Sequence, residues 1–363
     1  MKKRALPGAK QSWTAILKIK KYICLLLLPL FLFGDDASTP KAEEPEELFN
    51  SCVPGILVNA ECLYWNLQEG SLDYALRMKN RAWGPTPSFA QGDFERATFD
   101  WDPGYRFSLG YYRAENFWEV LSEYTFIRFK GSNETSAPPS DQSRFLNGTF
   151  PQIFTGPMER ATSHIHLGYK LFNLIACRVF HPPDNPHLRL RLKGGVTAAF
   201  LNQGWRVRYF DLTNNVTATQ NSWRYWGIGL RVGTTFDWFW GNDFYATGSF
   251  STALTLGHYH NHAKQTTTAA PLPGDNPSIP VRDARYKDYR MALTMQLSLG
   301  PSYQKSFEKW RMEIFAGYEL TTWSNLHEIY RSTQSAPESA KETWQNTGLI
   351  TMQGLTTRAS FTF

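Results

Sequence analysis

The chain ends in Leu355-Thr356-Thr357-Arg358-Ala359-Ser360-Phe361-Thr362-Phe363, and this stretch decides the fold class. Its even-numbered residues are polar, whereas its odd-numbered residues run from Leu355 to Phe363 and are mostly apolar. Side chains of a strand point to opposite faces at every second residue, so the stretch predicts an amphipathic β-strand. An amphipathic last strand ending in phenylalanine has the form of the sorting signal read by the bacterial outer-membrane assembly machinery. We therefore expect Phe361 and Phe363 to carry that signal and the strand to close a barrel, which leaves no edge in lipid.

The same alternation recurs upstream. Between Asp288 and Tyr303, odd-numbered residues form an apolar face with a tyrosine at each end, and even-numbered residues are largely polar. Soluble strands are usually about five or six residues long, whereas a spanning strand needs about 9–11. Comparable alternation is found in five further segments: Tyr105–Tyr111, Leu188–Phe200, Trp226–Phe236, Phe244–Leu256 and Trp310–Leu320.

Composition limits the fold class less than the alternation of apolar and polar residues does. Of the 363 residues, 15% are aromatic and 19% are charged, which suits either a membrane barrel or a large secreted β-sandwich. The only long apolar run, Tyr22 to Phe33, is too short for a spanning helix of roughly 20 residues. The long alternating segments favour the all-β reading of a transmembrane, antiparallel, up-and-down β-barrel. At roughly 20–25 residues per strand with its loop, we expect about 12 strands, within a range of about 12–16.

The organisation along the chain follows from charge and turn residues. Residues 1–34 read as a signal peptide with a basic start, the apolar run Ile23–Phe33 and a small Gly34, with a signal anchor as the alternative. Residues 35–54 form an acidic periplasmic segment, and residues 55–363 form the barrel. We expect long extracellular loops at Gly131–Met158, Asn261–Pro280 and Ser332–Glu342, which are rich in turn-forming residues.

Charge and cysteine content limit the partners. The net charge is +6, but lysines and an arginine in the first 21 residues account for most of it, so we expect no nucleic acid partner. After the leader, Cys52, Cys62 and Cys177 remain, an odd number that leaves at least one thiol free or intermolecular. The predicted location is the bacterial outer membrane, with the lipid bilayer as a partner.

A basic ladder is the main candidate for a function in the lumen. Arg189, Arg191 and Lys193 share one face of one segment, and Arg206 and Arg208 follow on the next. If the two segments are neighbouring strands, their cations line the wall and attract anions, since ringed charges set pore selectivity. Carboxylates on polar faces could instead neutralise the ladder: Glu119, Glu123, Asp237, Asp288, Glu313 and Glu319. Both alternatives stay open, and Arg290 is a further pore-lining candidate.

Aromatic residues predict the membrane borders. Tyr and Trp side chains suit the interface between acyl chains and headgroups, because their rings have an apolar body and a polar edge. The candidates for such a girdle are Tyr289, Tyr303, Trp310, Tyr318, Trp226 and Trp238.

The sequence contains no pattern of an enzyme. Gly-x-Ser-x-Gly, the phosphate-binding Gly-Lys-Ser/Thr and His-Glu-x-x-His are absent. His258, His260 and His262 alternate and could share one face as a metal clasp, but a polar loop rim is the better interpretation. We therefore expect no catalytic residues, no metal and no cofactor.

Several segments resemble the Legionella-type major outer membrane protein family, which includes similar porins of chlamydia-related bacteria. In order along the chain, they are Ala60–Trp65, Trp101–Tyr111 with Phe117–Val120 and Tyr124–Phe126, Tyr225–Gly233, Ala316–Glu319 and Gln353–Thr356, with the terminal Phe363. The resemblance implies an abundant porin-like barrel, often at the host-contact surface of an intracellular bacterium. Chlamydial members are rich in disulfide-linked cysteines, whereas this chain keeps only three cysteines after the leader.

The leading expectation is a porin that lets small hydrophilic solutes or ions diffuse through a polar, charge-lined lumen. The alternatives are a surface adhesin or antigen that acts through its long loops, and a structural envelope barrel linked by disulfides. A homo-oligomer and host surface molecules are candidate partners.

Overall fold

The computed structural model describes residues 55–78, 92–113, 118–137, 145–150, 157–180, 182, 185, 187–212, 215–268, 279–307, 310–332, 342–346 and 348–363. The predicted signal peptide (1–34) and acidic segment (35–54), with Cys52, lie outside these residues. No helix in the described part of the chain is long and apolar enough to cross a membrane.

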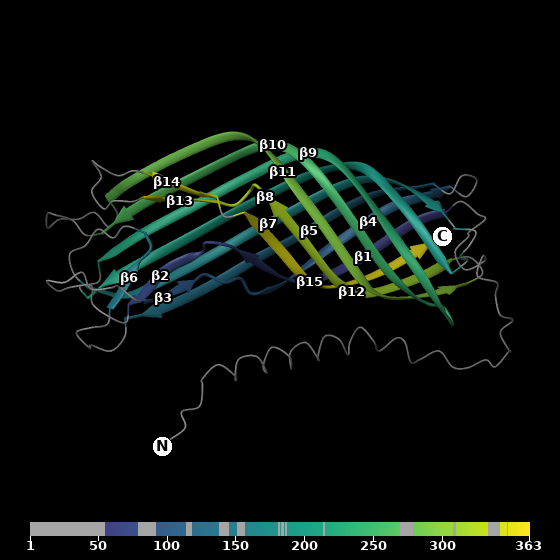
Figure 1. Ribbon diagram of the computed structural model, residues 1–363, viewed down its shortest axis with the longest axis horizontal. Helices are drawn as coiled ribbons and strands as arrows, with labels where there is room; N and C mark the ends of the chain where they lie inside the picture. Colours follow the sequence, from purple (N-terminus) through teal and green to yellow (C-terminus); the bar gives the residue numbers. More distant parts are fainter. Residues whose placement is uncertain are drawn as a thin grey trace, which may run out of the picture. The chain divides into compact units, whose positions relative to one another are not determined.

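Ten antiparallel strands of the described residues form a closed ring (Figure 1). Going round the ring, each strand pairs with the next, and the last strand pairs with the first: β1 (Gly55–Glu69), β4 (Trp101–Arg113), β5 (Trp118–Ser136), β7 (Met158–Phe180), β8 (Leu188–Asp211), β9 (Val216–Gly241), β10 (Phe244–Thr267), β11 (Ile279–Ser306), β12 (Arg311–Ser324) and β15 (Leu349–Thr362). The predicted all-β, up-and-down barrel is confirmed. The C-terminal strand β15 pairs with β1 and β12, as expected for the strand that closes it.

The barrel has ten strands where the sequence predicted about 12, because its strands are longer than spanning requires. β11 runs for 28 residues and β9 for 26, against about 9–11 for a spanning strand. Parts of the two predicted loops Gly131–Met158 and Asn261–Pro280 are therefore strand. β5 continues to Ser136, β10 continues to Thr267 and β11 begins at Ile279. The extra strand length consumes the residues that would have formed two more strands.

The two ends of the barrel differ. At the end where β1 begins and β15 finishes, consecutive strands are separated by only two to seven residues of sequence. Asn242 and Asp243 both have positive φ, 50° and 64°, as a two-residue turn of type I′ requires. Outer-membrane barrels have short periplasmic turns and longer extracellular loops, so this end is periplasmic.

The opposite, extracellular end carries short additional strands. β2 (Asp73–Met78), β3 (Gly92–Arg96) and β6 (Phe145–Gly148) extend the sheet beyond β7. β13 (Glu328–Ser332) and β14 (Glu342–Asn346) form a separate hairpin between β12 and β15. Both additions lie at the same end of the barrel in Figure 1, away from the C terminus.

The outer surface is an apolar belt bordered by aromatic residues. Exposed aliphatic side chains such as Leu230, Leu256 and Leu299 cover it, an arrangement that only lipid can solvate favourably. On the extracellular side, Trp226 and Tyr289 flank His258, with ring centroids 4.9 and 4.2 Å from the histidine. We call Trp226, His258 and Tyr289 the upper aromatic row.

The other predicted girdle residues lie toward the periplasmic end. Tyr303 contacts Phe244, and Trp310 contacts Phe361, while Tyr318 and Trp238 are exposed on the outer face. Tyr289 and Tyr303 are 14 positions apart, which corresponds to about 46 Å along the strand. At a tilt of about 45° this is about 33 Å across the membrane, close to the thickness of a bilayer core.

Gly227 offers a test of packing inside the barrel. It faces inward in register with Gly257, and a Cβ at Gly227 would lie 2.3 Å from the hydroxyl of Tyr225. That hydroxyl donates to the carbonyl oxygen of Thr255 at 3.2 Å. We expect Gly227→Val to displace the Tyr225 ring and to lower the free energy of unfolding by about 1–3 kcal/mol, measured by urea unfolding in detergent micelles.

Gly194 provides the matched control, because a Cβ there would meet no atom within 4 Å. Gly194→Val should change the stability by less than about 0.5 kcal/mol. Equal urea midpoints for the two variants would contradict this account of the packing.

Candidate functional site

The periplasmic half of the lumen holds a cluster of charged side chains around two adjoining cavities. The cavities have volumes of about 120 and 80 Å³ and share Glu61, Glu123, Ile175, Lys193 and Arg358 among their lining residues. The larger one extends to Arg311 and Thr362 at the periplasmic ends of β12 and β15. We call this region the charged chamber; its charged lining residues are Glu61, Arg106, Glu119, Glu123, Arg189, Arg191, Lys193, Arg231, Arg311, Glu313, Glu319 and Arg358.

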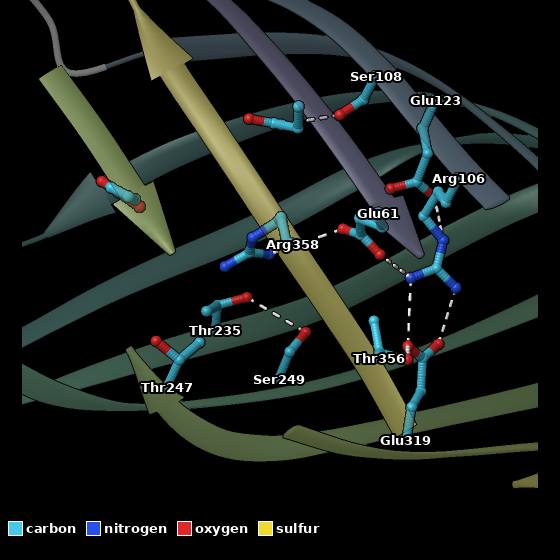
Figure 2. A network of polar contacts seen from close by, with 12 residues as sticks. Glu61, Arg106, Ser108, Glu123, Thr235, Thr247, Ser249, Glu319, Thr356 and Arg358 are labelled. Carbon is cyan, nitrogen blue, oxygen red and sulfur yellow. Dashed lines mark hydrogen bonds and ion pairs between the residues drawn. The ribbon is translucent and has the colours of Figure 1, made fainter. Parts of the chain in front are cut away.

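Arg106 of β4 is the centre of the chamber's main network (Figure 2). Its guanidinium donates to Glu61 at 2.6 Å and to Glu319 at 2.8 Å, and its Nε donates to Thr125 at 3.0 Å. Glu319 also accepts a hydrogen bond of 2.9 Å from Thr356. One buried arginine thus joins β1, β5 and β12 across the lumen, and charge-assisted hydrogen bonds of this kind are the strong ones.

Three residues of the predicted ladder, Arg189, Arg191 and Lys193, face the lumen, and the two arginines are paired. Arg189 and Arg191 each donate to the same oxygen of Asp237 at 2.9 Å, and Thr247 donates to its other oxygen at 2.8 Å. Asp237 is fully buried, so the neutralisation alternative describes these two arginines. Lys193, one step further along the ladder, has no hydrogen-bond or ion-pair partner among the described residues.

The chamber is close to neutral as a whole. Seven cations and five carboxylates are found among its described lining residues, and Asp237 behind the ladder adds a sixth carboxylate. Glu313 accepts from Arg311 at 2.6 Å and from Tyr245 at 3.1 Å. The carboxylates therefore cancel most of the attraction for anions that an unpaired ladder of cations would produce.

An aromatic layer lies in the lumen above the chamber. Trp65, Tyr169 and Trp323 point inward and are 1%, 2% and 0% exposed. Tyr169 packs edge-on against Trp323 at 6.3 Å, and the Trp65 indole donates to Thr356 at 3.1 Å. Further aromatic and aliphatic side chains continue this packed core toward the extracellular end, including Phe129, Leu167, Trp205, Trp223, Tyr225, Tyr259 and Met352.

A buried chain segment contacts the extracellular ends of the wall strands. Residues Leu326–Ile329, which we call the inserted segment, follow β12 and are all less than 5% exposed. Glu328 accepts from Arg290 at 2.7 Å through its carboxylate and from Asn261 at 3.1 Å through its carbonyl oxygen. His327 contacts the carboxylate of Glu69 on β1. The segment is therefore held to three wall strands by polar contacts.

The predicted pore-lining residues lie in three places: the chamber, the extracellular end of β11 and the outer face of β8. Glu119, Glu123, Glu313 and Glu319 line the chamber together with Arg189, Arg191 and Lys193. Asp288 and Arg290 lie near the extracellular end of β11, where Arg290 holds the inserted segment and stacks 3.8 Å from the Tyr259 ring. Their part in conduction stays a prediction.

Arg206 and Arg208 do not join the ladder. Both are exposed on the outer face of β8, whereas Trp205, Val207 and Tyr209 point inward and are buried. The prediction failed because it placed these arginines on a separate strand. β8 runs without interruption from Leu188 to Asp211, so its alternation puts residues 206 and 208 opposite residues 189–193.

Several chamber residues were not among the predicted ones: Glu61, Arg106, Arg231, Arg311 and Arg358. The signal was present, because Arg106, Arg231 and Arg358 each occupy the polar face of an alternating segment. What the sequence could not provide was the register between strands far apart in the chain. That register brings Arg106 opposite Glu61, and it places Glu319 close to both.

The three alternating histidines lie on the outer face of β10. His258 belongs to the upper aromatic row, and His262 contacts Asp283 at 3.0 Å. No group of side chains able to hold a metal ion is found among the described residues. Cys62 is exposed on the outer face and Cys177 is buried in the chamber wall, so these two free thiols lie on opposite faces of the barrel.

Removal of Arg106 should be strongly destabilising. Arg106→Leu leaves Glu61 and Glu319 buried beside each other without their cation, which we expect to cost about 3–5 kcal/mol in unfolding free energy. In Arg106→Leu/Glu319→Gln one of the two carboxylates is also removed, so part of that loss should be regained. Urea unfolding measures Arg106→Leu, Glu319→Gln and the double variant, and a double variant that loses as much as the sum of the two single variants would contradict the pairing.

The family model of the Legionella pneumophila major outer membrane protein precursor matches residues 54–362 of this chain. No curated protein sequence matches the chain. Similar solved structures include the outer membrane protease OmpT of Escherichia coli, with 9% identity, 85% of this chain and 96% of that chain covered, and a TM-score of 0.32.

Two further structures are similar at the same level. A FadL homologue of Pseudomonas aeruginosa has 11% identity, 89% and 94% coverage and a TM-score of 0.23. The toluene transporter TbuX of Ralstonia pickettii has 9% identity, 85% and 88% coverage and a TM-score of 0.26. These values are too low to support any argument about activity, whereas the family match covers the whole barrel. The chain belongs to the Legionella pneumophila major outer membrane protein family and is an integral β-barrel of the bacterial outer membrane.

Proposed function

We propose that this barrel is a gated, non-enzymatic channel for small polar solutes or ions. The proposal rests on the charged chamber, which extends to the periplasmic ends of its strands and ends at the aromatic layer. Replacing a buried ion pair with well-packed apolar residues is often neutral or stabilising. A lumen whose only requirement was stability would not need seven cations and six carboxylates in its described residues, whereas a path for polar solutes would.

In this proposal the described conformation is the closed one. The side chains of Trp65, Tyr169 and Trp323 in the aromatic layer are almost fully buried, so water does not reach them in this conformation. Movement of the inserted segment is the step that opens the mouth, because wall side chains, those of Arg290, Asn261 and Glu69, hold this segment. Opening also has to displace aromatic side chains below it, so we expect short and infrequent openings.

A surface or structural role is the second candidate, and the packed lumen is the observation that favours it. A ten-stranded barrel is only slightly wider than the eight-stranded barrels that side chains fill completely. A disulfide-linked network through this barrel could not use Cys177, because that thiol is buried inside the wall. Planar-bilayer recordings separate the two candidates.

Weakening the hold on the inserted segment should open the channel. Arg290→Ala removes the 2.7 Å ion pair with Glu328, and the loss of a buried pair costs about 3–5 kcal/mol. Even if only part of that loss acts on the closed state, the open probability should rise at least about tenfold in planar-bilayer recordings.

The matched control is Arg160→Ala, which breaks an exposed pair with Glu134 on the outer face and should leave the open probability unchanged. Folding of each protein is checked by the change in its gel mobility on heating. If folded wild-type and Arg290→Ala barrels never conduct, the channel is rejected and the structural role is favoured.

Ion selectivity should depend on Lys193 and not on Arg206. The near-balance of charges predicts a reversal potential close to zero in a salt gradient, and Lys193→Gln should move it toward cation selectivity, since lumen charges set selectivity. Arg206→Gln removes the same charge from the outer face and should leave the reversal potential unchanged. The opposite pattern would show that conduction does not pass through the charged chamber.

A further inference from the structure

A strip of basic side chains covers the outer face of β8–β11 toward the extracellular end. These side chains point outward and are exposed, in alternation with buried lumen residues. We call this strip the basic belt; it consists of Arg206, Arg208, Arg224, Lys264, Arg285 and Lys287.

The basic belt begins where the apolar surface ends. Strand register aligns Trp226, His258 and Tyr289 in the upper aromatic row, and one step further aligns Arg224, His260 and Lys287. Successive side chains on one face of a strand are about 6.6 Å apart, and neighbouring strands are about 4.8 Å apart. Arg224 and Lys287 therefore lie about 10 Å apart, immediately beyond the residues that mark the membrane border.

The belt is deficient in compensating charge. Asp283 is the only acidic residue that faces outward on this part of β8–β11 among the described residues, and it is engaged by Arg285 at 3.2 Å and by His262 at 3.0 Å. Arg224, Lys264 and Lys287 make no hydrogen bond or ion pair with any described side chain.

The cations do not encircle the barrel. At the same end, the outward residues of β1 and β15 are uncharged, with Asn66 and Gln68 on one strand and Thr351 and Gln353 on the other. On the other side of the belt, β5 carries the exposed Arg128 and Lys130. A general preference for charge near the membrane border would have placed cations on β1 and β15 too.

We propose that the basic belt binds the phosphate groups of the glycolipid in the outer leaflet. At this depth the belt is continuous with the lipid-facing surface, so the anions within its reach belong to lipid headgroups. Arginine donates paired hydrogen bonds to phosphate, and lysine acts as a compact point charge. Each cation near an anionic membrane surface contributes about a fivefold gain in affinity.

The test is titration of the barrel, purified from outer membranes into detergent, with lipid A carrying two phosphates, followed by native mass spectrometry. We expect saturable binding by the wild-type protein and little by the same lipid after removal of its phosphates. Arg224→Gln/Lys287→Gln should weaken binding of the phosphorylated lipid by about 25-fold. A heat-shift gel checks that each variant is folded.

The matched control is Arg178→Gln/Lys305→Gln, which removes two exposed cations near the periplasmic end of the same outer surface. It should stay within twofold of wild type. Equal binding by the dephosphorylated lipid, or retention of binding by Arg224→Gln/Lys287→Gln, would overturn the proposal. Binding of inorganic diphosphate as tightly as the lipid would also overturn it, by showing a general anion site.

Discussion

The structure depends on one constraint: every backbone hydrogen-bonding group of a strand in lipid needs a partner, so the sheet has to close. Closure is completed where β1 meets β15, and Ile56 and Phe363 exchange two backbone hydrogen bonds of 2.9 and 3.0 Å at its edge. With ten strands the ring is narrow, so side chains from opposite walls meet across the lumen. The inner faces must therefore be complementary to one another.

The chain meets this requirement in two different ways along the barrel axis. Toward the periplasm, charged side chains from β1, β4 and β12 share hydrogen bonds, so that buried charges have partners. Toward the outside, aromatic rings fill the same cross-section, and polar atoms such as the Trp65 indole N–H and the Tyr225 hydroxyl donate hydrogen bonds to neighbouring residues. The two regions meet where the Arg106 guanidinium lies 5.7 Å from the Trp65 ring, a contact in which a cation faces the negative face of an aromatic ring.

Periodicity made the fold predictable, because alternation in a membrane strand assigns each residue to lipid or lumen. It identified the outer face of β11 and the inward direction of Arg189, Arg191 and Lys193. It did not reveal where strands continue past the membrane, and so the strand number was too high and Arg206 was assigned to the wrong face. Pairings such as Arg106 with Glu61 and Glu319 depend on register between distant segments, which one sequence does not encode in any local pattern.

The length of β10 and β11 has a further consequence for the cell surface. From Tyr289 to Ile279, β11 continues for ten residues beyond the upper aromatic row, about 33 Å along the strand and about 23 Å above the bilayer at a tilt of about 45°. Because the two strands stay hydrogen-bonded to each other over this distance, their described residues form a stiff projection. A large molecule approaching the bacterium, such as an antibody, meets this raised hairpin before it meets the membrane.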